Sequence, residues 1–222
     1  MKSLCIGMGK SRVAGSCVGA DIDAKNIYKI VKEISTESLI LINDGALRDT
    51  VLDYMKRVIL DTDLTFIFYA GHGGSNRLKF YAPEEIDGND EMIFSYDNPI
   101  IDDEIWNIIK TSDHPVFLMF DCCHSETMFR IAPPKALFSR SLYDPIDMLC
   151  WSGCADNKVS YGNKDGGEFT NTFLKYYSPG ITYNELWKLL ATDKKLQESE
   201  IIKSTELKTS DLSKFGDKII FS

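Results

Sequence analysis

Two apolar stretches, LTFIFYAGHGG at residues 64–74 and VFLMFDCCHSE at residues 116–126, decide how this chain folds. Each begins as a continuous apolar run, which is typical of a strand buried on both faces of a parallel sheet. Each run ends on residues that can react: His72 in the first stretch and a Cys-Cys-His run in the second. A histidine and a cysteine at two strand ends predict a cysteine nucleophile and its base.

Strands and helices alternate on both sides of these stretches. The expected strands are residues 2–6, 39–43, 64–69, 116–120, 148–152 and 218–221, and the expected helices begin at Asp21 or span 47–59, 104–110, 168–177 and 183–195. Residues 75–101 are polar and predict a loop, with one short strand at 78–81. This alternation predicts an α/β fold, a three-layer sandwich whose mostly parallel central sheet of about six strands is flanked by helices.

The composition narrows the class of protein. A chain of 222 residues with 44% hydrophobic residues suits one domain spanning residues 1–222. A net charge of −8 argues against nucleic-acid binding and mildly favours a basic substrate. No signal peptide is visible, and no apolar run approaches the ~18 residues of a membrane helix. We therefore expect a cytoplasmic protein without a membrane partner.

The six cysteines predict free thiols rather than a scaffold of disulfides. A chain of this length with a full core does not need disulfide staples, and free thiols fit a reducing cytosol. Cys122 and Cys123 are adjacent, and no CxxC repeat occurs. Because no four Cys or His ligands fall at the usual spacings, a structural zinc site is not expected.

The two reactive strand ends can meet in space. Function gathers at the carboxyl ends of parallel strands, and neighbouring strands lie ~4.8 Å apart. If the strands before His72 and Cys123 are adjacent, the two side chains can therefore converge. Residues 71, 73 and 74 are glycines, which let a ligand approach the backbone closely. The alternative for His72 is a loop histidine hydrogen-bonded to the backbone.

The motifs YAGHGG and DCCHS resemble the two active-site motifs of the caspase-like clan, and specifically those of metacaspases. Four further segments are similar to metacaspase segments in the same order: GADIDAKNIYKIV, IIDDEIW, LCWSGCADNKVS and GGEFTNTF. The resemblance extends from Lys2 to about Phe173. It implies a caspase-like fold and a minimal catalytic domain with no prodomain before Lys2.

The resemblance also implies roles for the reactive residues. Cys123 is the nucleophile and His72 is the base, so that His124 is a motif residue only. The backbone N–H groups of Gly73 and Cys123 form the oxyanion hole. Cys122 fills a variable position, where a packed thiol is the simplest interpretation. These roles make the chain a cysteine endopeptidase that acts on protein or peptide substrates.

Charge at the site predicts which substrates are cut. Asp121 precedes the cysteines, and a carboxylate binds Arg through two hydrogen bonds or Lys as a point charge. The resemblance adds Asp23 and Asp102 to the same primary pocket, which implies cleavage after Arg or Lys. Each has an alternative: Asp23 as a carboxylate favoured by a helix dipole, and Asp102 as a helix N-cap.

Many metacaspases are activated by calcium through a cluster of surface carboxylates. The matching residues here are Glu85, Asp87, Asp102 and Asp103, and carboxylate oxygens are what calcium prefers. Arg130 stands where the family has a further acid, and a solvated acidic face is the alternative. No organic cofactor is expected.

Other positions affect preference and control. Ala70, Ala20 and Glu126 depart from the usual metacaspase residues at the rim of the pocket. The loop 125–145 is a candidate linker for self-cleavage, at Arg130, Lys135 or Arg140, since exposed loops are often cut. The resemblance implies a monomer, although an unpaired strand at the C-terminus offers an edge for dimerisation.

Two competing functions remain open. The first is a catalytically silent module with a caspase fold that acts in regulation or binding, because a fold does not by itself imply activity. The second is a thiol-redox or metal-binding domain that uses Cys122, Cys123 and His124. A disulfide between adjacent cysteines is strained, and no second ligand cluster accompanies this run.

Overall fold

The computed structural model describes residues 1–76, 90–122, 147–153, 162–193, 208–209 and 215–222. Its main element is a six-stranded sheet with the order β13-β10-β9-β5-β1-β4. The strands are β1 (Lys2–Gly7), β4 (Glu37–Ile42), β5 (Thr65–Ala70), β9 (Val116–Asp121), β10 (Met148–Ser152) and β13 (Lys208–Thr209). Five of them are parallel, and β13 pairs antiparallel with β10. The predicted mostly parallel sheet is confirmed.

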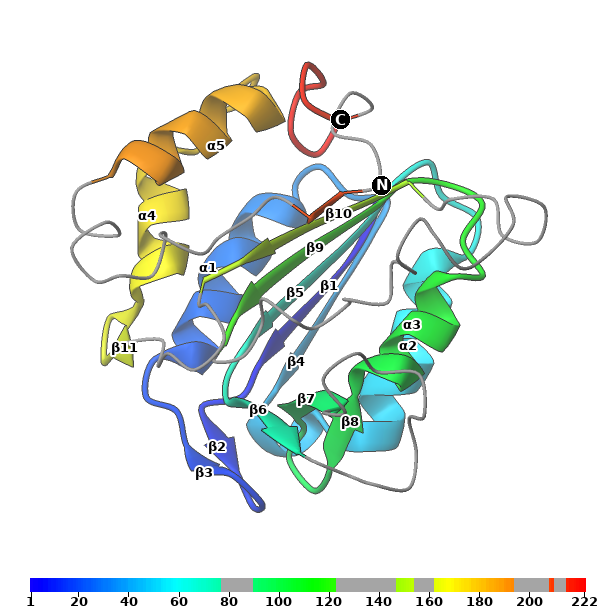
Figure 1. The fold of residues 1–222 in the computed structure, drawn as a ribbon, viewed down its shortest axis with the longest axis vertical. Coiled ribbons are helices and arrows are strands. Elements are labelled where there is room, and N and C mark those ends of the chain that lie inside the picture. Colours follow the sequence, from blue (N-terminus) through cyan, green and yellow to red (C-terminus); the bar gives the residue numbers. More distant parts are fainter. Residues whose placement is uncertain (77–89, 123–146, 154–161, 194–207, 210–214) are drawn as a thin grey trace.

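Helices cover both faces of this sheet (Figure 1). One face is covered by α1 (Ala20–Val31), α4 (Glu168–Tyr176) and α5 (Tyr183–Thr192). The other is covered by α2 (Arg48–Ile59) and α3 (Asp102–Ile109). This arrangement is the predicted three-layer sandwich.

Strand β9 shows why the apolar runs become central strands. Every residue from Val116 to Asp121 is buried. Phe117 and Met119 pack toward α1, α4 and α5, whereas Leu118 and Phe120 pack toward α2 and α3. Successive side chains of a strand point to opposite faces of the sheet. Because helices cover both faces here, the consecutive residues from Val116 to Phe120 must all be apolar. Each such side chain contributes about 1.5–3 kcal/mol by its burial.

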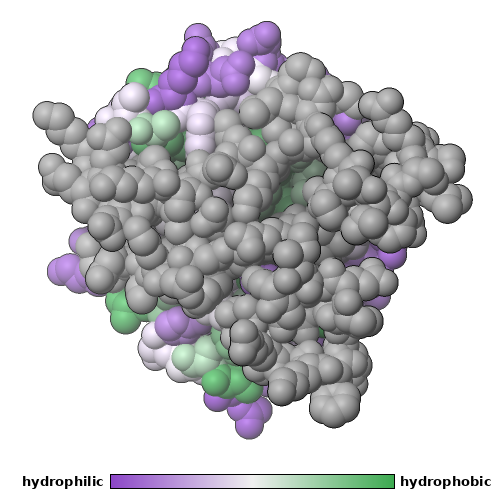
Figure 2. All heavy atoms as spheres, in the orientation of Figure 1, coloured by the Kyte–Doolittle hydropathy of each residue, from purple (hydrophilic) through white to green (hydrophobic). Residues whose placement is uncertain are grey.

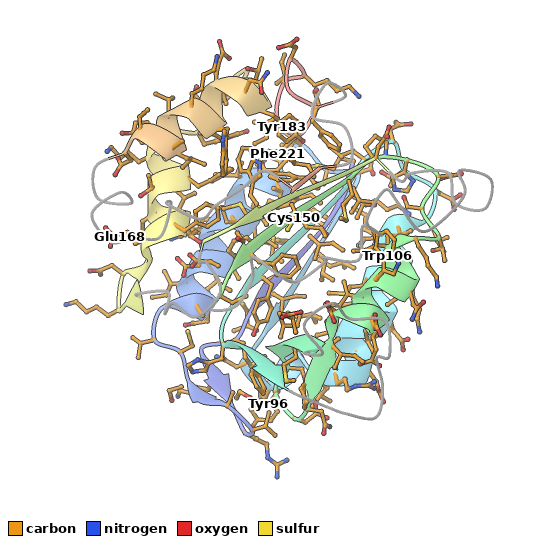
Figure 3. The ribbon with its side chains drawn as sticks, in the orientation of Figure 1. Tyr96, Trp106, Cys150, Glu168, Tyr183 and Phe221 are labelled. Atoms are coloured by element: carbon orange, nitrogen blue, oxygen red, sulfur yellow. The ribbon has the colours of Figure 1, made fainter. Side chains whose placement is uncertain are left out.

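Aromatic rings fill the core beneath α4 and α5. Phe117 contacts Trp151, Tyr183 and Phe221, with ring centroids 5.1, 5.2 and 6.0 Å away. Figure 3 shows Tyr183 and Phe221 close together on this face of the sheet. The C-terminal residues are thereby attached to the core beside α5.

The face that α1 buries differs slightly from the predicted one. Ile27 and Val31 are fully buried as predicted, but Ile34 lies beyond the end of the helix and is 45% exposed. Helix α1 lies close to β1, because a Cβ on Gly7 would overlap Ala24. The buried face is therefore set by small residues on the first turns as well as by the predicted isoleucines.

Residues 75–101 were predicted to be a loop, and this prediction is wrong for the described part. A three-stranded antiparallel sheet forms there from β6 (Gly73–Asn76), β7 (Asp90–Phe94) and β8 (Pro99–Ile101). A hairpin also forms after β1, from β2 (Lys10–Ser11) and β3 (Gly15–Ser16). These strands are too short to show an apolar alternation, although Ile93 and Ile100 are buried in the core. The predicted strand at 78–81 lies outside the described residues.

The predicted strand at residues 218–221 is also wrong. Residues 215–222 form turns, with one isolated bridge between Thr182 and Ile219. The apolar pattern has another cause, since Ile220 and Phe221 are buried by packing against the core. The described edge beside β10 is formed by β13 instead.

The remaining elements differ little from expectation. Helix α3 begins two residues earlier than predicted, and α5 ends at Thr192 instead of residue 195. A two-stranded ribbon, β11 (Gly162–Asn163) and β12 (Gly166–Gly167), precedes α4. Four cysteines lie in the described part of the chain, Cys5, Cys17, Cys122 and Cys150, and no disulfide joins any two of them. Within the described part of the chain, no helix is long and apolar enough to cross a membrane.

Candidate active site

The candidate site lies where the order of the strands reverses. Strand β1 is central, and the chain passes from it to β4 on one side and later to β5 on the other. When the chain leaves two adjacent parallel strands toward opposite sides of the sheet, a crevice forms at the carboxyl ends of those strands. The β2–β3 hairpin follows β1, and β6 follows β5, so both lie at this edge (Figure 1).

The register of β5 and β9 aligns the two reactive stretches. These strands are adjacent and parallel, and Ala70 pairs with Asp121. His72 and Cys123 each lie two residues beyond this pair in the sequence. Cys123 and His124 lie outside the described residues. Cys122 is fully buried in the core beneath α2 and α3, which is where a packed thiol would lie.

The ring of His72 is held by the hairpin after β1. Its Nε2 atom lies 3.0 Å from the carbonyl oxygen of Ser16. A carbonyl oxygen only accepts hydrogen bonds, so Nε2 must carry the hydrogen. In the neutral ring the lone pair is then on Nδ1. This tautomer gives the imidazole one nitrogen that can accept a proton.

The main chain of His72 is fixed as well. Its carbonyl oxygen accepts hydrogen bonds from the Tyr69 hydroxyl, at 2.7 Å, and from the N–H of Phe94, at 3.2 Å. The residue before His72 must be a glycine, because a Cβ on Gly71 would overlap Tyr69 and Met8. The next residue, Gly73, begins β6 and pairs with Ile93 of β7. The histidine therefore sits on a rigid backbone.

The hairpin that holds His72 is itself anchored to the small sheet. The hydroxyl of Ser11 donates to the Ser95 carbonyl at 2.8 Å, and the N–H of Arg12 donates to the Tyr96 carbonyl at 2.8 Å. The lower edge of Figure 2 shows both hydrophilic and hydrophobic described residues. Val13, between β2 and β3, is exposed. The role of Ser16 could not be predicted from the sequence, because it acts through its backbone carbonyl, which every residue type has.

Two of the predicted pocket acids come together on the face covered by α1 and α4. Asp23 is 2% exposed and Asp121 is 5% exposed. Oδ2 of Asp23 accepts a 2.8 Å hydrogen bond from the N–H of Gly167. Oδ2 of Asp121 accepts from the N–H of Thr170, at 3.1 Å, and from its hydroxyl, at 2.7 Å. The start of α4 thus joins an acid of α1 to an acid of β9.

This pair of acids is electrostatically strained. Burial, and then the negative charge of Asp121, raise the pKa of Asp23 from 3.8 to about 8, against the hydrogen bond from Gly167. Oδ1 of Asp23 is buried and has no hydrogen-bond partner among the described residues. Two buried carboxylates repel each other unless a proton or another cation lies between them. The pair is therefore suited to bind a positive charge.

Asp102 occupies a different place. It is the first residue of α3, on the face opposite α1, and its Oδ1 accepts the N–H of Asp103 at 3.0 Å. It is 1% exposed, whereas a surface cluster was predicted. Among the described residues, no group of three His, Cys, Asp or Glu side chains could hold a metal ion. Two predicted calcium ligands, Glu85 and Asp87, lie outside those residues.

Comparison with known families identifies the class of protein. The family model of the caspase domain matches residues 2–208, and the chain therefore belongs to the caspase domain family. Metacaspase-1 of Ajellomyces capsulatus (strain NAm1 / WU24) is 29% identical over 144 residues, covering 56% of this chain and 40% of the relative. Metacaspase-1 of Schizosaccharomyces pombe (strain 972 / ATCC 24843) is 28% identical over 144 residues, covering 56% of this chain and 33% of the relative. The match thus spans less than half of either relative.

Solved structures share the fold. A crystal structure of a protein from Geobacter sulfurreducens superposes with a TM-score of 0.68 at 21% identity, covering 85% of this chain and 87% of the other. Caspase-1 from Spodoptera frugiperda gives a TM-score of 0.60 at 14% identity, covering 93% of this chain and 83% of the other. At these identities the likeness shows the caspase-like fold alone.

Proposed function

We propose that this caspase domain is a cysteine endopeptidase that cleaves peptide bonds after Arg or Lys, with Cys123 as nucleophile and His72 as base. The observation that carries the proposal is the buried pair Asp23 and Asp121, which lies at the same sheet edge as His72. A buried carboxylate pair is costly without a cation, and a basic substrate side chain supplies one.

In the first half of the reaction, Nδ1 of His72 accepts the proton of the Cys123 thiol. The thiolate attacks the substrate carbonyl carbon, and the electron pair of the C=O bond moves to the oxygen. The N–H groups of Gly73 and Cys123 stabilise that oxyanion. When the intermediate collapses, the C–N bond breaks and the imidazolium of His72 gives its proton to the leaving amine. A thioester on Cys123 remains.

In the second half, His72 takes a proton from a water molecule as that water attacks the thioester carbonyl. The C–S bond then breaks, Cys123 recovers its proton from His72, and the acid product leaves. The fixed tautomer of His72 serves both halves, since Nδ1 is the nitrogen that gains and loses the proton. The Ser16 carbonyl supports the imidazolium through the hydrogen bond to Nε2.

Specificity follows from the acid pair. An Arg side chain offers a planar fork of donors for the two carboxylates, and Lys offers a point charge. Binding of either one displaces the proton that Asp23 otherwise holds. An aspartate side chain would add a third negative charge to the pair and is therefore disfavoured.

The test uses three peptide reporters that differ only in ending on Arg, Lys or Asp. We expect cleavage of the Arg and Lys reporters and none of the Asp reporter. Cys123→Ala must abolish turnover and covalent labelling by an Arg-directed electrophile. Cys122→Ala, a change at the adjacent buried thiol, is the matched control and keeps both. Preference for the Asp reporter, or labelling that survives Cys123→Ala, would contradict the proposal.

Calcium activation is part of the proposal, with Glu85, Asp87, Asp102 and Asp103 as ligands. In the structure, Asp102 and Asp103 are adjacent at the start of α3, which supports the proposal only in part because calcium takes about six to eight oxygens. Turnover of the Arg reporter should fall when a chelator is added and return with excess calcium. Turnover that is the same in both buffers would refute this part.

We also propose self-cleavage in the loop 125–145 and activity as a monomer. Intact-mass spectrometry of the purified protein should show fragments ending at Arg130, Lys135 or Arg140. The Cys123→Ala protein should stay intact, and equal fragment patterns would rule self-cleavage out. Sedimentation of the active protein should give the mass of one chain, 25.1 kDa, and a dimer mass would exclude the monomer.

A further inference from the structure

Helix α4 begins without a capping side chain of its own. Its N-cap residue is Gly167, which makes no side-chain hydrogen bond. The first backbone N–H groups of a helix have no partner inside it. Here two N–H groups at this start, those of Gly167 and Thr170, donate to Asp23 and Asp121, which lie 144 and 49 positions away in the sequence. The start of α4, labelled at Glu168 in Figure 3, is therefore capped by distant acids.

Thr170 makes the larger contribution to this arrangement. Its side chain is fully buried, and its N–H and hydroxyl both donate to the same oxygen, Oδ2 of Asp121. Two donors from one residue fix where that oxygen lies, and so fix the rotation of the carboxylate. A carboxylate that accepts charge-assisted bonds in this way is held more firmly than by a single neutral bond.

Two glycines give the acids room. A Cβ on Gly167 would overlap Asp121, and a Cβ on Gly166 would overlap Oδ1 of Asp23. Gly166 has a φ of +112°, a backbone conformation that other residues rarely adopt. The turn before α4 is thus shaped around both carboxylates at once.

Helix capping alone does not explain this design. A Ser or Asp as N-cap residue is enough to cap a helix locally, without the cost of burying two carboxyl groups side by side. The contacts to α4 use the Oδ2 atoms, whereas Oδ1 of Asp23 is buried and has no partner among the described residues. A buried carboxylate oxygen that the helix start does not use can accept a hydrogen bond from a cationic ligand.

We infer that Thr170 is the positioning residue for substrate specificity: it orients Asp121, beside Asp23, toward the basic side chain that precedes the cleaved bond. This inference deepens the proposed function and rests on it. Thr170 touches the acid and not the substrate, so its effect is on recognition of the positive charge rather than on the chemical step.

The experiment compares Thr170→Val, which removes the hydroxyl, with Thr170→Ser, which keeps it. Thr172→Val is the matched control, because Thr172 is also buried on α4 but its hydroxyl donates to the Glu168 carbonyl, at 2.8 Å, and not to an acid. Each protein is assayed with reporters that end on Arg or on the neutral Gln. Agmatine, a small guanidinium compound, is added separately, and the rise in melting temperature reports its binding without any need for turnover.

We expect Thr170→Val to raise KM for the Arg reporter about tenfold, the usual effect of losing a hydrogen bond to a charged group. Turnover of the Gln reporter should change less than twofold, agmatine should no longer raise the melting temperature, and Thr170→Ser should restore both. An equal loss on the Arg and Gln reporters, or the same loss in Thr172→Val, would show a structural role and overturn this inference alone. If the wild type neither cleaves basic reporters nor binds agmatine, both the proposed function and this inference fall.

Discussion

Two helices in this molecule begin at clusters of carboxylates, and they do so in different ways. At the start of α3 the acids are consecutive in the sequence: Asp102, Asp103 and Glu104. Asp102 accepts the N–H of Asp103, and Glu104 accepts the N–H of Ile101 and also pairs with Arg48 of α2. At the start of α4 the acids come from α1 and β9, and neither belongs to the helix that it caps.

This difference distinguishes acids that stabilise their own helix from acids that distant elements bring together. Local acids at a helix start stabilise it through the dipole and a cap. Acids that converge from distant elements carry an added cost of burial and mutual repulsion, as the raised pKa of Asp23 shows. Strained ionisable groups of this kind gather at functional sites. The α4 pair therefore deserves a functional interpretation, and α3 supplies its natural control.

The largest expected effect concerns recognition of the substrate. Asp121→Asn should lower kcat/KM for the Arg reporter by about a thousandfold, since removing one partner of a buried charge pair costs about 2–5 kcal/mol. Glu104→Gln at the start of α3 should change it less than twofold. Steady-state kinetics on both variants checks this, and similar losses in the two would remove the distinction between the helix starts.

The second effect is a dependence of binding on pH. Asp23 has a pKa of about 8 and must lose its proton before a guanidinium binds, so affinity should fall as the pH drops below 8. The charges that act on it, Asp121 of β9 and Asp21 of α1, are both negative. We expect agmatine to bind about ten- to fiftyfold more weakly at pH 6 than at pH 8. Calorimetric titration measures this, with Asp23→Asn as the variant whose pH dependence should flatten.

The third effect concerns folding stability: replacing an acid by Asn should stabilise the protein at the start of α4 and destabilise it at the start of α3. In the folded protein Asp23 keeps its proton up to about pH 8, whereas its ordinary pKa is 3.8. Ionising it therefore costs folding stability, and this cost grows as the pH rises from about 4 to 8. Asp23→Asn cannot ionise, so it should stabilise the protein at pH 8 by at least ~2 kcal/mol, given about 1.36 kcal/mol for each pKa unit, and by almost nothing at pH 4. Thermal unfolding at the two pH values measures it; destabilisation at pH 8 would mean a purely structural acid.

The smallest effect is expected at the start of α3. Asp102→Asn should destabilise the protein by about 0.5–1 kcal/mol in calcium-free buffer, since it removes a charge that favours the helix N-terminus. Chemical denaturation with a chelator present measures the change. If Asp102→Asn instead stabilises the protein, as expected for Asp23→Asn, the acids at the starts of α3 and α4 do not differ in the way proposed.

These contrasts also show how far the sequence leads. Central strands such as β5 and β9 could be predicted because their apolar runs have one physical explanation, burial on both faces. The pairing of β5 with β9 was a condition for the site, and the register of Ala70 with Asp121 meets it. The short strands β6, β7 and β8 could not be predicted, because β6 has no apolar side chain and the apolar runs of β7 and β8 are too short to distinguish a strand from a loop.

The site was predictable only where a side chain has a distinctive chemistry. His72 and Asp121 follow apolar runs and attract notice for that reason, and Asp23 was found through the family resemblance. Ser16 and Thr170 were missed, since one acts through its carbonyl oxygen and the other through a contact 49 positions away. Such partners become visible only when the fold brings distant segments together.

The register of β5 and β9 has a consequence for how the sequence of this domain can change. Ala70 and Asp121 are paired across the two strands, and His72 and Cys123 each follow this pair by two residues in the sequence. The register therefore sets the positions of both residues together. Inserting or deleting one residue between Thr65 and His72 would turn every later side chain to the opposite face of the strand. Side chains around the site can be exchanged, but the number of residues on each strand is fixed by the spacing of the sheet.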